Sequence, residues 1–138
     1  MKITICGSMA FAKEMLDVKD KLEQAGHTCF VPYDTEAHVK GLLKKIGGSE
    51  GAKRKIALDL IRKHYDLINT SDAILVLNYD KKRVKNYIGG NSFLEMGYAY
   101  IMRKKIFLMN DIPETKLIKQ EIQSMQPIII HGDLSKII

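Results

Sequence analysis

The sequence has 138 residues, of which 46% are hydrophobic and 28% are charged, and its 22 basic and 16 acidic residues give a net charge of +6. These values are typical of one globular domain over residues 1–138, and no apolar run approaches the ~20 residues that a membrane span needs. The positive charge favours an anionic ligand. Tryptophan is absent and no aromatic series is available for stacking on bases, which disfavours nucleic acid and favours a small phosphate-bearing molecule.

The cysteines and the first residues bear on metal binding and location. Cys6 and Cys29 both lie in predicted strands, which favours reduced thiols in the core over a disulfide. Neither has neighbours at a metal-ligand spacing, so we expect no metal and no cofactor. Segment 1–11 has one lysine before a short apolar run, which predicts a first strand and not a signal peptide, and hence a cytoplasmic location.

Predicted strands and helices alternate along the chain. Apolar runs rich in β-branched residues predict strands at 2–6, 27–31, 72–78, 105–110 and 128–131. Apolar residues at helical spacing predict helices at 9–25, 53–68, 92–103 and 113–126, with a short helix at 133–138. Segment 33–53 is the least regular: 41–46 is compatible with a short helix, 47–51 (GGSEG) has no packed assignment, and a mobile lid and a plain surface insertion both remain open.

Two of these helices have an expected inward face. For helix 53–68 the inward residues are Ala57, Leu60, Ile61, Tyr65 and Ile68. His64 falls inside this stripe and Asp66 on the opposite face. For helix 113–126 the inward residues are Leu117, Ile118, Ile122 and Met125.

The alternation predicts an α/β fold: a doubly wound, five-stranded parallel sheet of order 2-1-3-4-5, in a flavodoxin-like or Rossmann-like three-layer sandwich. In such sheets ligands bind beyond the carboxyl ends of the strands, where the winding reverses. Here that point lies between the first and third strands. The loops that meet there are 7–9 and 79–91, so we expect the first turn and the helix that carries Glu95 to come together.

Glu95 is the strongest catalytic candidate. It lies near the predicted start of helix 92–103 among Phe93, Leu94, Met96 and other apolar or small residues, which we expect to bury nearly every side of the helix. A carboxylate that helix amides stabilise and that is shielded from water has the properties of a nucleophile. The alternative is structural, because Ser92 to Glu95 also fits a capping box.

The turn at Gly7 and Ser8 is a candidate anion site. It precedes a helix whose free amides favour a negative charge, and the serine adds a hydroxyl. The alternative is an ordinary serine helix cap. The loop residues Lys81, Lys82, Arg83 and Lys85 can steer an anion inward, although a solvated charge run explains them equally well.

Three motifs resemble the nucleoside 2-deoxyribosyltransferases and the related 2'-deoxynucleoside 5'-monophosphate N-glycosidases. They are CGSMAF at 6–11, SDAILVLNYD at 71–80 and, most specifically, GGNSFLEMGYA at 89–99. The resemblance implies that Glu95 attacks the anomeric carbon of a nucleoside or nucleotide and displaces the base, as a retaining glycosidase does. The substrate-binding residues that it implies are Cys6, Gly7, Ser8, Asn78, Gly89, Gly90, Asn91, Ser92 and Ser124.

The chain also departs from the family pattern. Where the family has an aspartate that assists at the base, this chain has His64, which we take as its replacement and the proton donor to the base; a satisfied core histidine is the alternative. Ala10 and Gly89 stand where the two branches have an arginine and an aspartate. Ser124 resembles a serine that reaches the phosphate from a neighbouring subunit, which implies a homodimer or a larger homo-oligomer.

These observations predict an N-glycosidase acting on a nucleotide or nucleoside, with hydrolysis slightly favoured over transfer to a second base. One alternative is a phosphoribohydrolase of the cytokinin-activating kind, because GGNSFLE is loosely similar to the GGxGTxxE motif of that family. The other is a non-catalytic nucleotide sensor on the same fold.

Overall fold

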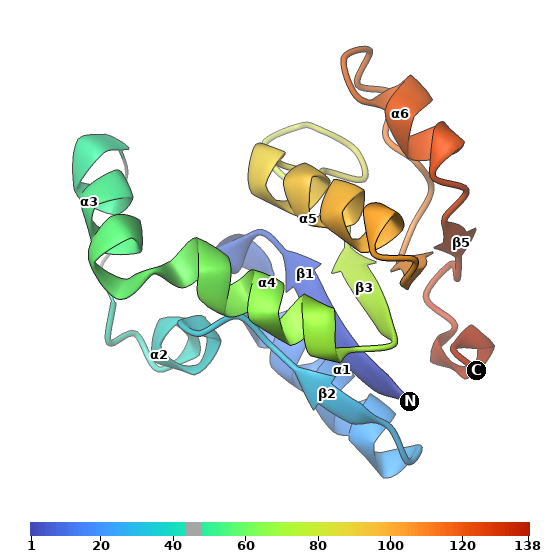
Figure 1. Ribbon diagram of the computed structural model, residues 1–138, viewed down its shortest axis with the longest axis horizontal. Helices are drawn as coiled ribbons and strands as arrows, with labels where there is room; N and C mark the ends of the chain where they lie inside the picture. Colours follow the sequence, from blue (N-terminus) through green and yellow to red (C-terminus); the bar gives the residue numbers. More distant parts are fainter. Residues whose placement is uncertain (44–47) are drawn as a thin grey trace.

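The computed structural model describes residues 1–43 and 48–138 (Figure 1). Its strands form one parallel sheet in the order β2-β1-β3-β4-β5, which confirms the predicted α/β class and strand order. The strands are β1 (Lys2–Gly7), β2 (Thr28–Phe30), β3 (Ala73–Leu77), β4 (Lys105–Leu108) and β5 (Ile128–Ile129). Every residue of β3 is buried, as its apolar sequence predicts for a central strand that is covered on both faces.

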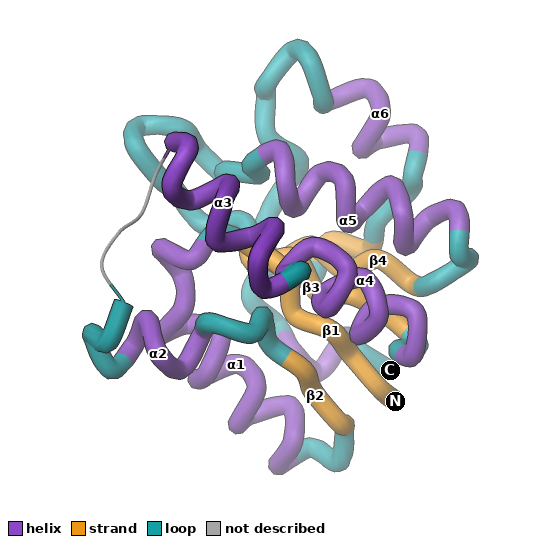
Figure 2. Tube along the Cα trace, turned by 60° about the vertical axis from the view of Figure 1, so that its left-hand side comes forward, coloured by secondary structure: helices purple, strands orange, loops and turns teal. Residues whose placement is uncertain are grey.

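Helices cover both faces of the sheet (Figures 1 and 2). They are η1 (Met9–Phe11), α1 (Ala12–Gln24), α2 (Thr35–Val39), α3 (Gly48–Leu58), α4 (Leu60–Thr70), α5 (Gly90–Ile101), α6 (Lys119–Ser124) and η2 (Leu134–Lys136). Alternate strand residues point to opposite faces, so Ile3 and Ile5 pack with Met15 and Leu22 of α1. Cys6, by contrast, packs on the other side with residues of α4, α5 and α6.

Residues 53–68 do not form the single continuous helix that was predicted. The chain forms α3 and then α4, and between them Asp59 adopts a left-handed conformation with a φ of 50°. Aspartate tolerates this conformation better than most residues, and one such residue changes the direction and phase of a helix. Ala57, which precedes the break, and Ile61, which lies in the first turn of α4 and lines the pocket, were both expected inside and are exposed; the exposed fraction of Ile61 is 52%. Ile68 and His64 are buried as expected.

The segment before α4 also differs from expectation. Gly48 to Gly51, which had no packed assignment, form the first turn of α3. In the part of the predicted 41–46 helix that is described, Gly41 to Leu43 are not helical. The rest of that prediction, and Gly47, lie outside the described residues.

The predicted helix 113–126 is much shorter in the structure. Pro113 is buried and Ile112 packs against the core, which holds this part of the chain in a non-helical path, and α6 begins only at Lys119. Ile122 is buried as predicted, but Leu117, expected inside, is 89% exposed because it precedes the helix. Within the described ranges, no helix is both long enough and apolar enough to cross a membrane.

Candidate active site

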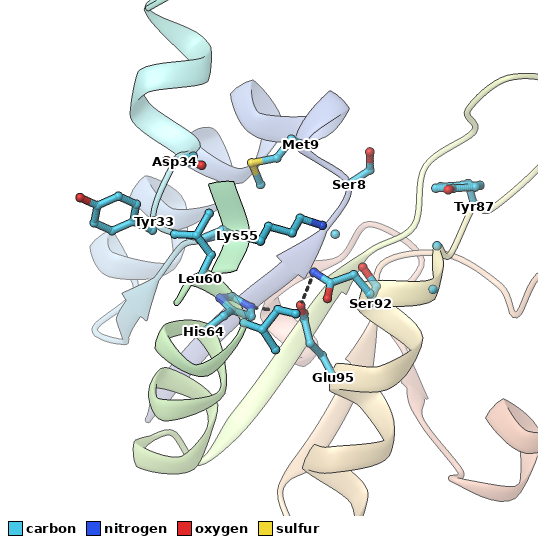
Figure 3. Close-up of a pocket in the computed structure, with 16 residues that line it drawn as sticks. Ser8, Met9, Tyr33, Asp34, Lys55, Leu60, His64, Tyr87, Ser92 and Glu95 are labelled. Carbon is cyan, nitrogen blue, oxygen red and sulfur yellow. Dashed lines mark hydrogen bonds and ion pairs between the residues drawn. The ribbon is translucent and has the colours of Figure 1, made fainter. Parts of the chain in front are cut away.

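A pocket of about 300 Å³ lies at the carboxyl ends of β1, β2 and β3, where the topology predicted a ligand site. Its walls come from the turn after β1, the segment after β2, helices α3 and α4, and the start of α5 (Figure 3). The volume is at the lower end of the range for small-molecule sites. The lining residues are Gly7, Ser8, Met9, Pro32, Tyr33, Asp34, Lys55, Leu60, Ile61, His64, Tyr87, Gly89, Gly90, Asn91, Ser92 and Glu95.

Glu95 lines this pocket with only 3% of its surface exposed. Helix α5 begins at Gly90, earlier than expected, with Gly89 as its N-cap, so the capping box at Ser92 does not form. Glu95 therefore lies in the second turn, and the expectation that free helix amides stabilise it is wrong. Its Oε1 accepts a hydrogen bond of 3.0 Å from Asn91 Nδ2, while Oε2 has no hydrogen-bond partner among the described residues.

His64 faces Glu95 from α4. The distance from His64 Nε2 to Glu95 Oε2 is 3.2 Å, and the same nitrogen lies 3.4 Å from Cys6 Sγ (Figure 3 shows the His64 and Glu95 contact). His64 is 8% exposed, and its Nδ1 has no partner in the described chain. Asp66 is exposed on the other side of α4, as the helical period predicts. Three ionisable side chains from β1, α4 and α5 therefore meet beneath the pocket.

Cys6 lies behind the pocket and is absent from its lining. Burial raises the pKa of its thiol well above the usual value, and the charge of Glu95 and a hydrogen bond to Glu95 raise it further. Cys6 is therefore protonated at neutral pH. It contributes to the floor beneath Glu95 and His64 and makes no direct contact with the cavity.

Ser8 is a helix cap, the structural alternative that the sequence offered, and it also contacts a lysine. Its Oγ accepts a hydrogen bond of 3.2 Å from Ala10 N, which is the expected cap, and one of 2.8 Å from Lys81 Nζ. Lys81 also lies over the ring of Tyr87, 4.9 Å from its centroid. Of the four basic loop residues, Lys82, Arg83 and Lys85 are exposed, whereas Lys81 is half-buried beside Ser8.

Helix α3 brings in a lysine that the sequence did not single out. Figure 3 shows the side chain of Lys55 extending across the pocket toward Ser8. No described residue of α3 is buried, and the helix is tied to the segment after β2 by the two-pronged ion pair of Arg54 with Asp34. In this pair Arg54 Nη2 donates to Asp34 Oδ1 at 2.9 Å, and the hydrogen bonding lowers the pKa of Asp34.

Besides Cys6, two residues of the implied binding set lie away from the cavity. Asn78 is buried at the end of β3, where its amide donates to the carbonyls of Asn110 and Asp111 and accepts from Asn110 N. It braces the loop after β4. Ser124 lies on α6, where its exposed hydroxyl donates to Gln120 O at 2.8 Å. A role for Ser124 thus depends on a second subunit.

Other pocket residues were missed because they carry no motif. Tyr33 and Asp34 follow β2 directly, and strand ends on this side of a parallel sheet are a usable signal. Lys55, Leu60 and Tyr87 offer no such signal.

No protein-family model matches this chain, and no curated protein matches it either. Solved structures share its fold at low identity. A 2-desoxiribosyltransferase from Leishmania mexicana has a TM-score of 0.52 and 17% identity, over 79% of this chain and 65% of that one. A CMP N-glycosidase from Clostridium botulinum has a TM-score of 0.50 and 14% identity, over 94% of this chain and 85% of that one.

A 2-deoxyribosyltransferase from Bacillus psychrosaccharolyticus has a TM-score of 0.48 and 21% identity, over 78% of this chain and 71% of that one. The chain is thus an α/β protein that shares its fold with the Leishmania and Clostridium enzymes. At this identity the likeness extends to the fold alone, and it confirms at that level the family resemblance that the motifs predicted.

Proposed function

We propose that the protein is an N-glycosidase that cleaves the bond between base and sugar in a nucleotide or nucleoside, with Glu95 as the nucleophile. The observation that supports it best is the placement of Glu95: buried in the wall of the pocket, with one oxygen hydrogen-bonded to Asn91 and the other 3.2 Å from His64 Nε2. The fold shared with a 2-desoxiribosyltransferase and a CMP N-glycosidase agrees with this proposal.

The proposed reaction has two steps. The Glu95 carboxylate forms a bond to the anomeric carbon while the glycosidic C–N bond breaks through an oxocarbenium-like transition state. The electron pair of that bond stays on the base nitrogen, which takes a proton from His64. Water, or a second base, then attacks the anomeric carbon, gives its proton to the now neutral His64, and releases Glu95 as a carboxylate. Hydrolysis is the favoured outcome of the second step.

The opposite end of the pocket suits a 5'-phosphate. Lys81 supplies a positive charge 2.8 Å from the Ser8 hydroxyl, and Lys55 points toward the same end. These two lysines offer the charge that Ala10 cannot provide. An extended substrate would place its phosphate at Ser8 and its anomeric carbon at Glu95.

We also propose that the enzyme is a homodimer, as the resemblance implies. Leu94 and Ile101, seven residues apart on α5, are 65% and 74% exposed, which corrects the expectation that α5 is buried on nearly every side. An apolar helix face beside the pocket is a suitable contact for a second subunit. The mass in solution, measured by light scattering for the natural chain and for Leu94→Glu, tests this: a monomer in both cases would refute it.

The direct test of function is base release. The protein is incubated with ribo- and deoxyribonucleosides and their 5'-monophosphates, and free base is measured by chromatography. Glu95→Gln should abolish release, whereas Glu121→Gln, an exposed glutamate on α6, should not change it. No base from any substrate would refute the enzyme, and a ligand bound and recovered intact would favour a sensor. Release that survives Glu95→Gln would refute the nucleophile.

A further inference from the structure

The fold assembles a group of metal-ligand atoms that no sequence spacing reveals. One thiol sulfur, one imidazole nitrogen and one carboxylate oxygen, from Cys6, His64 and Glu95, all lie within 4.8 Å of one another, and all three residues are buried. They come from three separate elements, β1, α4 and α5. We propose that these three side chains bind one Zn²⁺ ion beneath the pocket.

Two of the three ligand separations match those around the ion, and the third, from Cys6 Sγ to the Glu95 oxygen, is at most 4.8 Å. Bonds of about 2.3 Å to sulfur and about 2.0 to 2.1 Å to nitrogen and oxygen, at tetrahedral angles, place sulfur and nitrogen about 3.5 Å apart and nitrogen and oxygen about 3.3 Å apart. In the structure Cys6 Sγ to His64 Nε2 is 3.4 Å, and His64 Nε2 to Glu95 Oε2 is 3.2 Å. Along these two edges the ligands need to move by only about 0.1 Å.

The carboxylate oxygen is aimed at the same place. Glu95 Oε2 is buried, accepts no regular hydrogen bond among the described residues, and faces His64 Nε2 at 3.2 Å, so an ion bound between the two would contact both atoms. The hydrogen bond from Asn91 Nδ2 to Oε1 can persist when Oε2 binds the ion, and it would then orient the ligand from the outer shell.

The donor set selects the class of metal. Sulfur and imidazole nitrogen favour zinc and its neighbours over magnesium or calcium, which prefer oxygen ligands alone. Three protein ligands leave a fourth tetrahedral position. Because His64 and Glu95 line the pocket, the pocket is the route by which the ion enters and by which water reaches that position.

Binding has a consequence for the proposed activity. The ion takes up the Glu95 oxygen and the His64 nitrogen, and the Cys6 thiol releases its proton to solvent as it becomes a thiolate ligand. Zn²⁺ would therefore block nucleophile and proton donor together and inhibit base release reversibly. This inhibition depends on the proposed function, whereas the binding of the ion does not.

Cobalt and zinc chlorides added to the metal-free full chain test the site. Co²⁺ should bind at one equivalent and give the near-ultraviolet charge-transfer absorption of a cobalt–thiolate bond, and Zn²⁺ should displace it. Cys6→Ser should abolish the absorption, and His64→Gln should weaken binding at least about 100-fold, because even loss of an outer-shell partner costs 10- to 100-fold. Asn91→Ala removes such an outer-shell partner, so it should weaken metal binding by about 10- to 100-fold.

Matched controls come from the same chain. Cys29→Ser removes the other buried cysteine, and His131→Gln removes an exposed histidine whose Nδ1 lies 3.8 Å from Asp111 Oδ1; neither should alter the cobalt spectrum. Circular dichroism checks that each variant is folded, and His64→Gln carries the comparison if Cys6→Ser does not fold. A spectrum unchanged in Cys6→Ser or lost in Cys29→Ser, or no cobalt binding by the folded natural chain, would overturn the proposal.

Activity separates the two proposals. One bound zinc without base release would leave the metal site standing and refute the enzyme. Base release that is unaffected by a full equivalent of bound zinc would place the ion away from Glu95 and overturn the metal site described here.

Discussion

Lys81→Met tests how the pocket distinguishes a nucleotide from a nucleoside. The substitution keeps a flexible side chain of similar length but removes the charge that lies 2.8 Å from Ser8 Oγ. A hydrogen bond to a charged group contributes about 1.5 to 3 kcal/mol. Because Lys81 is only half-buried, solvent screening favours the lower half of that range, about 1.5 to 2 kcal/mol.

That free energy corresponds to a fall of roughly 10- to 30-fold in kcat/KM. We expect this fall for 5'-monophosphates and little change for the corresponding nucleosides, which lack the phosphate. The assay measures base release from both members of each pair. Lys82→Met, at the exposed neighbouring position, is the matched control and should affect neither substrate.

The comparison within each pair protects the test from indirect effects. Lys81 also contacts the Tyr87 ring, so its loss could alter the loop. Such a change would lower kcat/KM for nucleosides and monophosphates alike. Equal losses on both substrates would therefore refute the assignment of Lys81 to the phosphate.

Three further predictions concern the proton donor, the tether of α3 and the core. His64→Ala should lower kcat/KM by about 10²- to 10⁴-fold for ordinary bases. It should lower kcat/KM far less for a substrate with an activated leaving group, since such a group leaves without a proton. Equal losses on the two kinds of substrate would mean that His64 only positions Glu95 or the substrate. The hydrogen bond from Arg54 lowers the folded-state pKa of Asp34 below its ordinary value of 3.8, so the tether of α3 is fully present above that value and is lost as pH falls through the lowered pKa. Asp34→Asn should therefore speed hydrogen exchange in α3 at pH 7, and an unchanged exchange rate would show that other contacts hold the helix. Ile68→Ala should lower the free energy of unfolding in urea by about 2 to 5 kcal/mol, because Ile68 is fully buried, whereas Ile61→Ala on the same helix should change it by about 0.5 kcal/mol or less; similar losses at both positions would contradict the observed difference in burial between the two ends of α4.

The fold could be predicted because its signals are local and repeated. Each strand is a short apolar run and each helix has its own period, and the rules for parallel crossovers leave few strand orders for such an alternation. The sequence 73–77 contains only apolar residues, so a central position for β3 followed directly. The same rules located the pocket, since the ends of parallel strands lie at one edge of the sheet.

The errors arose where one residue changes the path of the chain. The left-handed Asp59 splits the predicted helix 53–68, and the turn after Pro113 delays α6 to Lys119. Periodicity averages over a window and does not detect a single break of this kind. The start of α5 was misplaced because Gly90 is a poor helix former, yet it is the first residue of the helix.

The sequence by itself determined that Glu95 would lie at the crevice of a parallel α/β sheet, because topology and helix phase place it there without knowledge of any contact. Only the tertiary structure decided what surrounds it. Cys6 and His64 are separated by 58 residues, and Ser8 and Lys81 by 73, yet each pair is in contact. Such meetings depend on how helices pack on the sheet and on where loops close, and those are properties of the whole chain that no local pattern encodes.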